Sequence, residues 1–578
     1  MRERYEETAT RSFVLLGRRI FWVDVWGFLG TLAVFGPGLL HRTLLSFSPN
    51  VTNDDSQQVT WSLFRYGDPL LFARDPIADY YLDTHLPFGY HVLMRGLASI
   101  FDPVVLLAVF DHVSVVVALV FAYLAGRFLA GRIGGWITVA LLLASDQLLD
   151  IMGGGLPRAG GMAIIFIALY GFVGDRRIYT AAASILGALF WYPAAVASGA
   201  LFAVQCLAPG ALLFDRADNE PVLKRILMVA AVGALTVVCA APKMLAQSHW
   251  GPVVTNASSA WPEAGPGGRL AHRDQLGYIS PIEIIPTTVR RTFVSAQAPW
   301  WGGGEFVQWL KGKVAAGLWL LLLAGLVLSS WTSLAARRVL TVIAVSISLS
   351  FVAAVIAPIL YAAPRYTAYI LPSASILAFT YLAGRIGVWL SSRVAWAPAA
   401  VPILAAGIVV FGLGGRPLSQ GYNVTLVPAE RQAIDFISQL PKSALIAGWP
   451  NQNGLLDRVP LFAKRSILMS FEVQLPFHEQ QLKRMRERAN AIIDAWFSAD
   501  EQALRSLAQR YGVTHFIIDK TRRADASLTY FRPFDEYIIA RRQALGDKQR
   551  WIETPPAAAT VFENDRYIIV DLARVGRS

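Results

Sequence analysis

The residues best suited to chemistry lie in one acidic stretch between the first two long apolar runs of the chain. It begins at Asn53-Asp54-Asp55 and ends near His85-Leu86-Pro87-Phe88-Gly89-Tyr90, and it holds six aspartates against two arginines. Carboxylates placed beside the mouth of a hydrophobic bundle are costly unless they bind a ligand or take part in a reaction. We therefore expect this loop to hold the reacting end of a membrane enzyme.

Asp54 and Asp55 are the first candidates for catalysis. Either carboxylate could take the proton of an attacking hydroxyl group in a glycosyl or phosphoryl transfer, or hold a divalent cation that neutralises a departing phosphate. Adjacent side chains point in different directions, so we expect one of the two to face the site. The alternative is a helix N-cap, since Asn, Asp and Ser all favour that position, and both interpretations can hold together.

A second acidic pair, Asp146 and Asp150, lies at the end of a later apolar run and precedes Gly153-Gly154-Gly155. Four residues apart on a helix, these two carboxylates share one face. Asp150 could meet Asp55 and complete an oxygen-ligand site for a cation such as Mg²⁺ or Mn²⁺. The alternative is a solvated helix end followed by a flexible turn.

Basic residues at the expected outer surface are candidates for binding a phosphate. Arg158 and Arg365 oppose the usual placement of positive charge on the cytoplasmic side. A guanidinium fork matches the oxygens of a lipid phosphate. The alternative is that these long side chains snorkel toward the membrane interface. His85 and Lys243 are weaker candidates for the same role.

The composition indicates which class of protein must position these residues. Of the 578 residues, 54% are hydrophobic and 16% are charged, and the mean hydropathy is +0.44. Many apolar runs approach the length needed to cross about 30 Å of hydrocarbon. The formal net charge is +12, but the basic residues cluster in short connectors between apolar runs, which indicates a polytopic membrane protein and excludes nucleic acid as the expected partner. Cys206 and Cys239 lie inside apolar runs and predict no disulfide framework.

The apolar runs predict about eleven transmembrane helices. They lie at about 22–45, 103–126, 133–149, 159–174, 178–190, 193–209, 226–247, 314–331, 339–361, 366–384 and 395–413. With the N-terminus in the cytoplasm every inner connector is basic, which places outer loops at 46–102 and 248–313. The run at 178–209 is interrupted at Trp191-Tyr192-Pro193 and could be one kinked helix or two short spans. Two spans fit the charge pattern better.

Three regions follow from this pattern: a cytoplasmic tail at 1–21, a transmembrane domain at 22–414 and an extracytoplasmic domain at 415–578. In the last region, short apolar runs such as Thr514–Asp519 are typical of strands and alternate with helix-like segments, which predicts a small α/β domain. The short basic tails and the absence of retention signals favour a bacterial inner membrane.

These motifs resemble those of the GT-C superfamily of integral-membrane glycosyltransferases, which includes protein mannosyltransferases, aminoarabinose transferases and catalytic subunits of oligosaccharyltransferases. Asp54-Asp55 corresponds to the acidic motif of the first outer loop, and His85–His91 resembles the aromatic, proline and glycine segment that follows. Pro364-Arg365-Tyr366 resembles the string that such enzymes place near the lipid phosphate, and Asp150 falls at a second acidic position. The resemblance covers roughly 20–415. The outer domain lacks a Trp-Trp-Asp motif, which argues against transfer to asparagine.

The resemblance implies an inverting transferase that moves a sugar from a polyprenyl-phosphate-linked donor to a glycan, lipid or protein acceptor outside the membrane. Asp54 or Asp55 would be the base, and Arg365 with Arg158 would stabilise the departing phosphate. One alternative is a transporter or flippase of lipids or glycans, which predicts broken helices in two related halves. Another is a non-catalytic membrane scaffold whose outer domain binds a partner.

Overall fold

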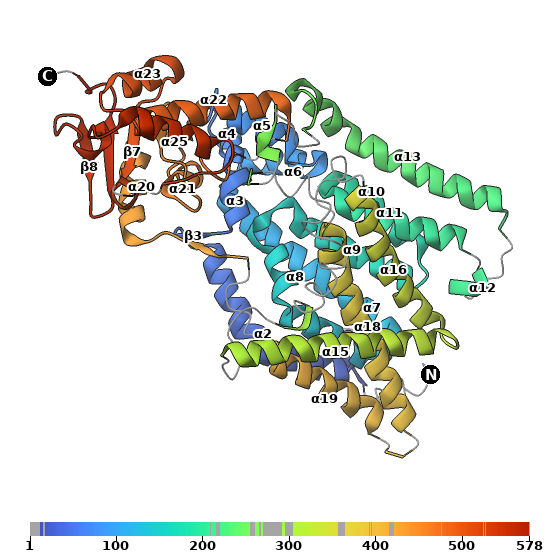
Figure 1. The fold of residues 1–578 in the computed structure, drawn as a ribbon. Coiled ribbons are helices and arrows are strands. Elements are labelled where there is room, and N and C mark those ends of the chain that lie inside the picture. Colours follow the sequence, from blue (N-terminus) through green and yellow to red (C-terminus); the bar gives the residue numbers. More distant parts are fainter. Residues whose placement is uncertain are drawn as a thin grey trace.

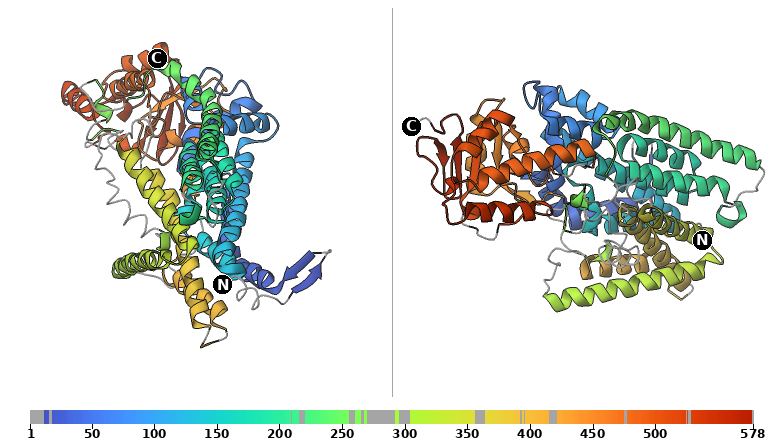
Figure 2. Two further views of the ribbon diagram at one scale, coloured as in Figure 1. Left: turned by 90° about the vertical axis from the view of Figure 1, so that its right-hand side faces the viewer. Right: turned by 45° about the horizontal axis from the view of Figure 1, so that its top comes forward.

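The structure is a computed structural model, and Figure 1 shows a body of helices with a mixed α/β domain at one end. It describes residues 12–15, 18–208, 210–214, 220–254, 260–264, 267–269, 292–294, 304–355, 364–391, 393–394, 396–414, 421–474, 477–523, 525 and 528–576. Most of the predicted outer loop 248–313 and the segment 415–420 therefore lie outside the described residues. Figure 2 shows the first described strands, Ser12–Leu15 and Arg18–Phe21, and the α/β domain at opposite ends of the molecule.

Within the described residues, six helices are long and apolar enough to cross a membrane. They are α2 (Trp22–Ser46), α7 (Pro103–Ala144), α13 (Val222–Gln247), α15 (Glu305–Ser330), α16 (Leu334–Val355) and α18 (Pro364–Leu390). The shorter apolar helices are α9 (Pro157–Val173), α10 (Arg177–Phe190), α11 (Tyr192–Leu207) and α19 (Ala397–Gly412). The helical membrane class is confirmed, and the number of eleven crossings stays a prediction.

Helix α7 is a helical hairpin and not one straight rod. A β-carbon built on Gly135 would lie 2.9 Å from the carbonyl oxygen of Tyr123, whereas residues twelve apart in a straight helix would be about 18 Å apart. The chain reverses at Gly131, whose φ of 67° is a conformation that glycine adopts readily. The turn lies at the basic connector predicted between the runs 103–126 and 133–149.

The interruption at Trp191 also separates two helices that fold back on each other. Trp191 is extended, with φ −165° and ψ 108°. The Ser184 hydroxyl donates to the Ala195 carbonyl at 3.2 Å, and the Thr180 hydroxyl donates to Oε1 of Gln205 at 2.8 Å. Partners near Trp191 are close in sequence and partners further from it are more distant in sequence, which is the pattern of two antiparallel helices. Two helices are therefore present, as expected. That α10 and α11 each span the membrane stays a prediction.

The C-terminal region forms a five-stranded mixed sheet in the order β6-β5-β7-β9-β8. Its strands are β5 (Leu445–Gly448), β6 (Ser466–Ile467), β7 (His515–Asp519), β8 (Thr560–Glu563) and β9 (Tyr567–Asp571). Strand β5 is parallel to β6 and β7, whereas β9 is antiparallel to β7 and β8. Helices accompany the sheet: α20 (Pro428–Gln439), α21 (Leu455–Phe462), α22 (Glu479–Trp496), α23 (Gln502–Tyr511) and α25 (Phe534–Leu545). This agrees with the predicted alternation of strands and helices.

The predicted first outer loop packs against the C-terminal α/β domain, which we call the outer domain after its predicted side of the membrane. Strand β3 (Val51–Thr52) pairs antiparallel with β4 (Val424–Thr425), where the chain enters the outer domain. One hydrophobic core contains loop residues such as Trp61 and Tyr81 together with outer-domain residues such as Ile446. In Figure 1 the loop helices α3 (Asp54–Val59), α4 (Phe64–Gly67), α5 (Pro76–Thr84) and α6 (Phe88–Ala98) lie in blue between the helical body and the orange and red domain. The acidic loop is therefore a folded layer.

Candidate functional site

Asp54 and Asp55 open helix α3, in a turn that Asn53 caps. The Asp55 backbone N–H donates to Oδ1 of Asn53 at 3.0 Å and to Oδ1 of Asp54 at 2.9 Å. The Asp54 backbone N–H donates to Oδ1 of Asn423 at 3.2 Å, which joins the turn to the outer domain. The N-cap and the acidic motif are thus the same turn, and the capping interpretation is correct without excluding chemistry at the carboxylates.

The two carboxylates have different surroundings. Asp55 forms an ion pair with Arg158, so two residues predicted from separate segments meet. The Arg158 Nε also donates to the Ile151 carbonyl at 3.1 Å, which fixes the guanidinium. Burial and the neighbouring charge of Asp55 raise the pKa of Asp54 above its usual value. A raised pKa makes a carboxylate a better proton acceptor, so Asp54 is the stronger candidate for the base.

Asp150 lies near this pair and binds the backbone. Its Oδ1 accepts a hydrogen bond from the Gly421 N–H at 3.1 Å, and its negative charge acts on Arg158. A guanidinium thus supplies positive charge beside Asp55 and Asp150, where the sequence predicted a metal ion. Among the residues that the structure describes, no group of three or more His, Cys, Asp or Glu side chains could hold a metal. A divalent cation at this site stays a prediction.

Lys243 lies near the end of α13, where it reaches the segment that follows the acidic loop. It is buried, its Nζ lies 3.1 Å from Nδ1 of His91, and it donates to the Leu82 carbonyl. The hydroxyl group of Tyr66 contacts the other ring nitrogen of His91. Sequence reasoning did not select His91 as a separate candidate; its place at the end of the His85–His91 motif was the only signal.

His85 ends helix α5 in a buried aromatic setting next to Lys243 and Arg365. Its ring lies 4.3 Å from the Tyr81 ring and 5.6 Å from the Phe477 ring. Burial, followed by the charges of His478, Arg365 and Lys243, lowers the pKa of His85 to about 3. His85 is therefore neutral at physiological pH and can donate a hydrogen bond without carrying charge. We call His85, Lys243 and Arg365 the basic cluster.

Tyr366 follows Arg365 in the chain and is buried among apolar side chains. Its side chain is 2% exposed and packs with Ala353, and partly buried Val196 lies against the same cluster. Its carbonyl accepts a hydrogen bond from the Ser346 hydroxyl at 2.8 Å. These contacts give Tyr366 a packing role between α11, α16 and α18, and a role in substrate binding stays a prediction.

Helix α18 and the outer domain connect the acidic turn with the basic cluster. Arg365 and Tyr369 lie one turn apart on α18; the charge of Arg365 acts on His85, and Tyr369 acts on Arg158. In the outer domain, the Glu472 carbonyl accepts a hydrogen bond from Nε2 of Gln58, on α3, at 2.6 Å. Acids, cations and the outer domain therefore converge at the outer end of the bundle. Such a site can move a proton and bind a phosphate.

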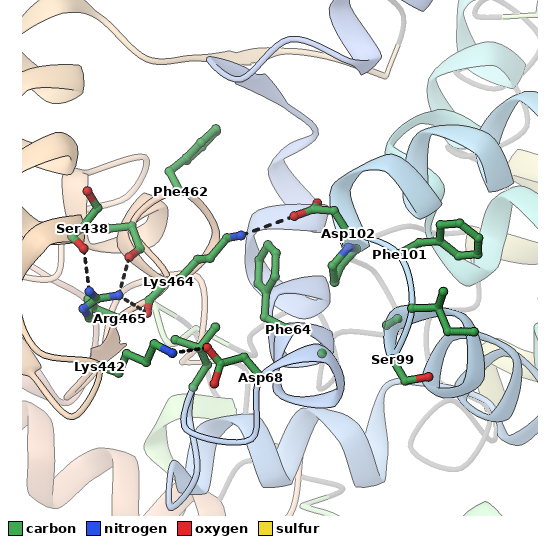
Figure 3. A pocket seen from close by; sticks show the side chains of 16 residues that line it. Phe64, Asp68, Ser99, Phe101, Asp102, Ser438, Lys442, Phe462, Lys464 and Arg465 are labelled. Carbon is green, nitrogen blue, oxygen red and sulfur yellow. Dashed lines mark hydrogen bonds and ion pairs between the residues drawn. The ribbon is translucent and has the colours of Figure 1, made fainter.

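A cleft of about 640 Å³ lies elsewhere along the seam between the first loop and the outer domain (Figure 3). Lys464 reaches Asp102 across it at 3.4 Å, and Lys442 pairs with Asp68. Phe64 forms part of the lining between these pairs. The predicted site residues do not line this cleft, so it is a feature of the seam and not of the candidate site.

No protein-family model and no curated protein matches the chain. Among solved structures, the oligosaccharyltransferase of Archaeoglobus fulgidus, tethered with an acceptor peptide containing the NVT sequon, matches at 14% identity and a TM-score of 0.47, over 86% of this chain and 68% of that one. The same enzyme with Zn and sulfate matches at 12% identity and a TM-score of 0.41, over 86% and 68%. ArnT from Cupriavidus metallidurans, bound to undecaprenyl phosphate, matches at 12% identity and a TM-score of 0.38, over 95% and 98%. Each of these alignments covers most of this chain.

Proposed function

We propose that the protein is a membrane glycosyltransferase that moves a sugar from a polyprenyl-phosphate-linked donor to a hydroxyl group of a glycan, lipid or protein outside the membrane. The observation that carries this proposal is the convergence of Asp54, the Asp55–Arg158 pair and the basic cluster at one end of α18. Transfer from a phosphate needs both a base for the acceptor and positive charge for the leaving group.

In the proposed reaction, the acceptor oxygen attacks the anomeric carbon of the sugar while the bond between that carbon and the donor phosphate oxygen breaks. The acceptor proton passes to the carboxylate of Asp54, whose raised pKa suits a base. The phosphate oxygen leaves with the electron pair of the broken bond. A single displacement of this kind inverts the anomeric configuration.

The basic cluster would receive the negative charge that develops on the leaving phosphate. Lys243 and Arg365 would supply positive charge, and neutral His85 would supply a hydrogen bond. Groups that are already in place where charge develops stabilise the transition state more than groups that must first reorganise. Arg158, held by Asp55, would fix the acidic turn and add positive charge on the opposite side of the phosphate.

A lipid-linked donor accounts for the position of this site at the end of a helix bundle. The long helices expose large apolar side chains, such as Leu29 on α2 and Leu227 on α13, to surrounding lipid. In the proposed orientation the N-terminus is cytoplasmic and the outer domain faces the periplasm or the cell exterior. The polyprenyl chain would then lie among the helices while its phosphate reaches the basic cluster.

The test of this function is transfer of radiolabelled sugar by the purified protein from a panel of polyprenyl-phosphate donors, with cell-envelope extract as the acceptor source. The wild type should transfer label from at least one donor, and Asp54→Asn should lose about 10²–10⁴-fold of that activity because it removes the base. Asp68→Asn, in the seam cleft, is the matched control and should transfer normally. A wild type that binds a donor but neither transfers nor hydrolyses it would favour a flippase or a scaffold.

A further inference from the structure

Glu472, in the outer domain, is held against the helix that carries Asp54 and Asp55. Gln58, on α3, donates through Nε2 to the Glu472 carbonyl at 2.6 Å and to its Oε2 at 3.2 Å. The Glu472 backbone N–H donates to Oδ1 of Asp457 at 3.0 Å. Both the backbone and the carboxylate of Glu472 are therefore fixed relative to α3, although 414 positions separate Gln58 from Glu472.

Within the part of the chain that the structure describes, the Glu472 carboxylate pairs with Arg269 and has several acidic neighbours. Arg269 Nη2 lies 3.2 Å from Oε2 of Glu472, and the Arg269 guanidinium lies over the Phe471 ring at 4.0 Å from its centroid. The other titratable groups that act on Glu472 or respond to it are Asp54, Asp55, Asp457 and Tyr530. Because the Glu472 side chain is only 16% exposed, solvent screens these charges weakly.

The ionised and protonated forms of the Glu472 side chain make different contacts with Arg269 and Gln58. The carboxylate accepts charge-assisted hydrogen bonds from Arg269 and Gln58, and such bonds are roughly twice as strong as neutral ones. The protonated acid loses the ion pair and part of its hold on Gln58. Burial, opposed by Arg269 and reinforced by Asp457, raises the pKa of Glu472 to about 7. Both states are therefore populated at neutral pH.

We infer, building on the proposed function, that Glu472 is a positioning residue for the transfer: its ionised carboxylate, bound to Arg269 and Gln58, holds the Asp54 helix in place against the outer domain. Glu472 touches α3 through Gln58 and makes no bond to the proposed reacting groups. Through this contact, the position of the Asp54 carboxylate depends on the outer domain being docked against α3. A carboxylate displaced by about 1 Å can lose on the order of 10²-fold in rate.

The test is the pH profile of transfer for the wild type, Glu472→Gln and Arg269→Gln. Wild-type kcat should rise as pH increases through about 7, because Glu472 becomes ionised. Glu472→Gln should lose this step and stay low, about 10-fold or more below the wild type at alkaline pH. Arg269→Gln removes the charge that favours ionised Glu472, so it should move the step to higher pH. Glu487→Gln, an exposed acid of α22, is the control.

The outcomes separate this inference from the proposed function. A wild type without transfer at any pH refutes the function and the inference together. A wild type that transfers while Glu472→Gln and Arg269→Gln follow its pH profile refutes the role of Glu472 alone. If Glu472→Gln does not elute as a single folded species in size-exclusion chromatography, the direction of the Arg269→Gln shift decides, because that variant keeps the Glu472 side chain.

Discussion

Asp54 and Asp55 are adjacent in the chain, yet the folded protein uses them differently. Asp55 forms an ion pair with Arg158. Asp54 lies beside another acid in a partly buried turn, so its proton is held more tightly. The surroundings of Asp54 suit a base, because they favour binding a proton. The surroundings of Asp55 suit a residue that holds the turn in place. We therefore propose that Asp54 takes the acceptor proton and that Asp55 holds Arg158 in place.

Asp457→Asn is expected to stabilise the protein at neutral pH. Asp457 is 2% exposed, and burial raises its pKa from 3.8 to about 6. The folded state therefore holds the proton more tightly than the unfolded chain, and stability is lost as pH rises from 3.8 to about 6 and stays lost above it. A shift of this size corresponds to on the order of 3 kcal/mol. Thermal unfolding followed by tryptophan fluorescence should show a gain for the variant above pH 6 that vanishes near pH 4.

Asp547→Asn provides the control for this measurement. Asp547 is exposed, so its substitution should leave the pH dependence of the unfolding temperature unchanged. An Asp457→Asn variant that is less stable than the wild type at pH 8 would show that the hydrogen bond from the Glu472 N–H to the carboxylate outweighs the burial of its charge.

At the scale of elements, a close contact between two glycines brings the start of the outer domain against the bundle. A β-carbon on Gly153 would lie 2.3 Å from the Gly421 Cα, and Gly421 has a φ of 84° that favours glycine. The Gly421 N–H also donates to Asp150, and β4 then pairs with β3 beside α3. The acidic turn therefore depends on this contact for its position.

Gly153→Ala should destabilise the protein by about 1–3 kcal/mol, because the added methyl group overpacks against backbone that has no room to move. It should also reduce transfer, since α3 lies next to the displaced strand. Both effects can be measured as an unfolding temperature and an initial rate. Gly30→Ala in α2 is the matched control: a β-carbon there meets nothing within 4 Å, and the substitution should lower neither the unfolding temperature nor the rate. A Gly153→Ala protein with wild-type stability would contradict the close contact.

Local sequence patterns were sufficient to predict the helices, turns and strands that form from residues close together in the chain. The basic residues around Gly131 marked the turn inside α7, and the break at Trp191 marked two helices, because both lie in interruptions of apolar runs. The apolar run Thr514–Asp519 gave a buried strand, β7. Asp55 and Arg158 were selected from separate segments, because the membrane does not tolerate charge without a partner, and they form an ion pair. Their roles in transfer stay predictions.

The remaining features depend on contacts between distant segments. No local spacing relates Gln58 to Glu472 or Lys243 to His91, since each pair meets only after the outer domain and α13 have docked. The packing of Tyr366 likewise follows from its helix neighbours and not from the Pro364-Arg365-Tyr366 string. The seam was also not predictable, because the first loop has the composition of a solvated segment and yet shares a core with the outer domain.

At the scale of the whole molecule, the first loop and the outer domain form one layer above the helices. The ion pairs of the seam, Lys442 with Asp68 and Lys464 with Asp102, are partly exposed and contribute little each, about 0–1 kcal/mol. The shared hydrophobic core supplies the larger stabilisation. We therefore expect the outer domain to stay docked during turnover, with the site beneath it.

The proposed orientation predicts which engineered cysteines a membrane-impermeant maleimide reaches in intact cells. Ser506→Cys, exposed on α23 of the outer domain, should react from outside. Thr332→Cys, exposed between α15 and α16, should react only after permeabilisation, because its connector carries Arg337 and Arg338 and is expected inside. The wild type is the background control, since Cys206 is buried and Cys239 lies within α13. The reverse pattern would contradict the orientation.

The most direct test of the central claim is a single-turnover experiment that follows donor binding and sugar transfer separately. With a polyprenyl-phosphate donor that the wild type uses, Asp54→Asn should bind with wild-type affinity and transfer sugar about 10²–10⁴-fold more slowly, because it keeps the basic cluster and lacks the base. Arg365→Gln should bind the same donor more weakly, because it loses a charge that we propose faces the phosphate. Transfer by Asp54→Asn at the wild-type rate, from a donor bound equally well, would contradict the account.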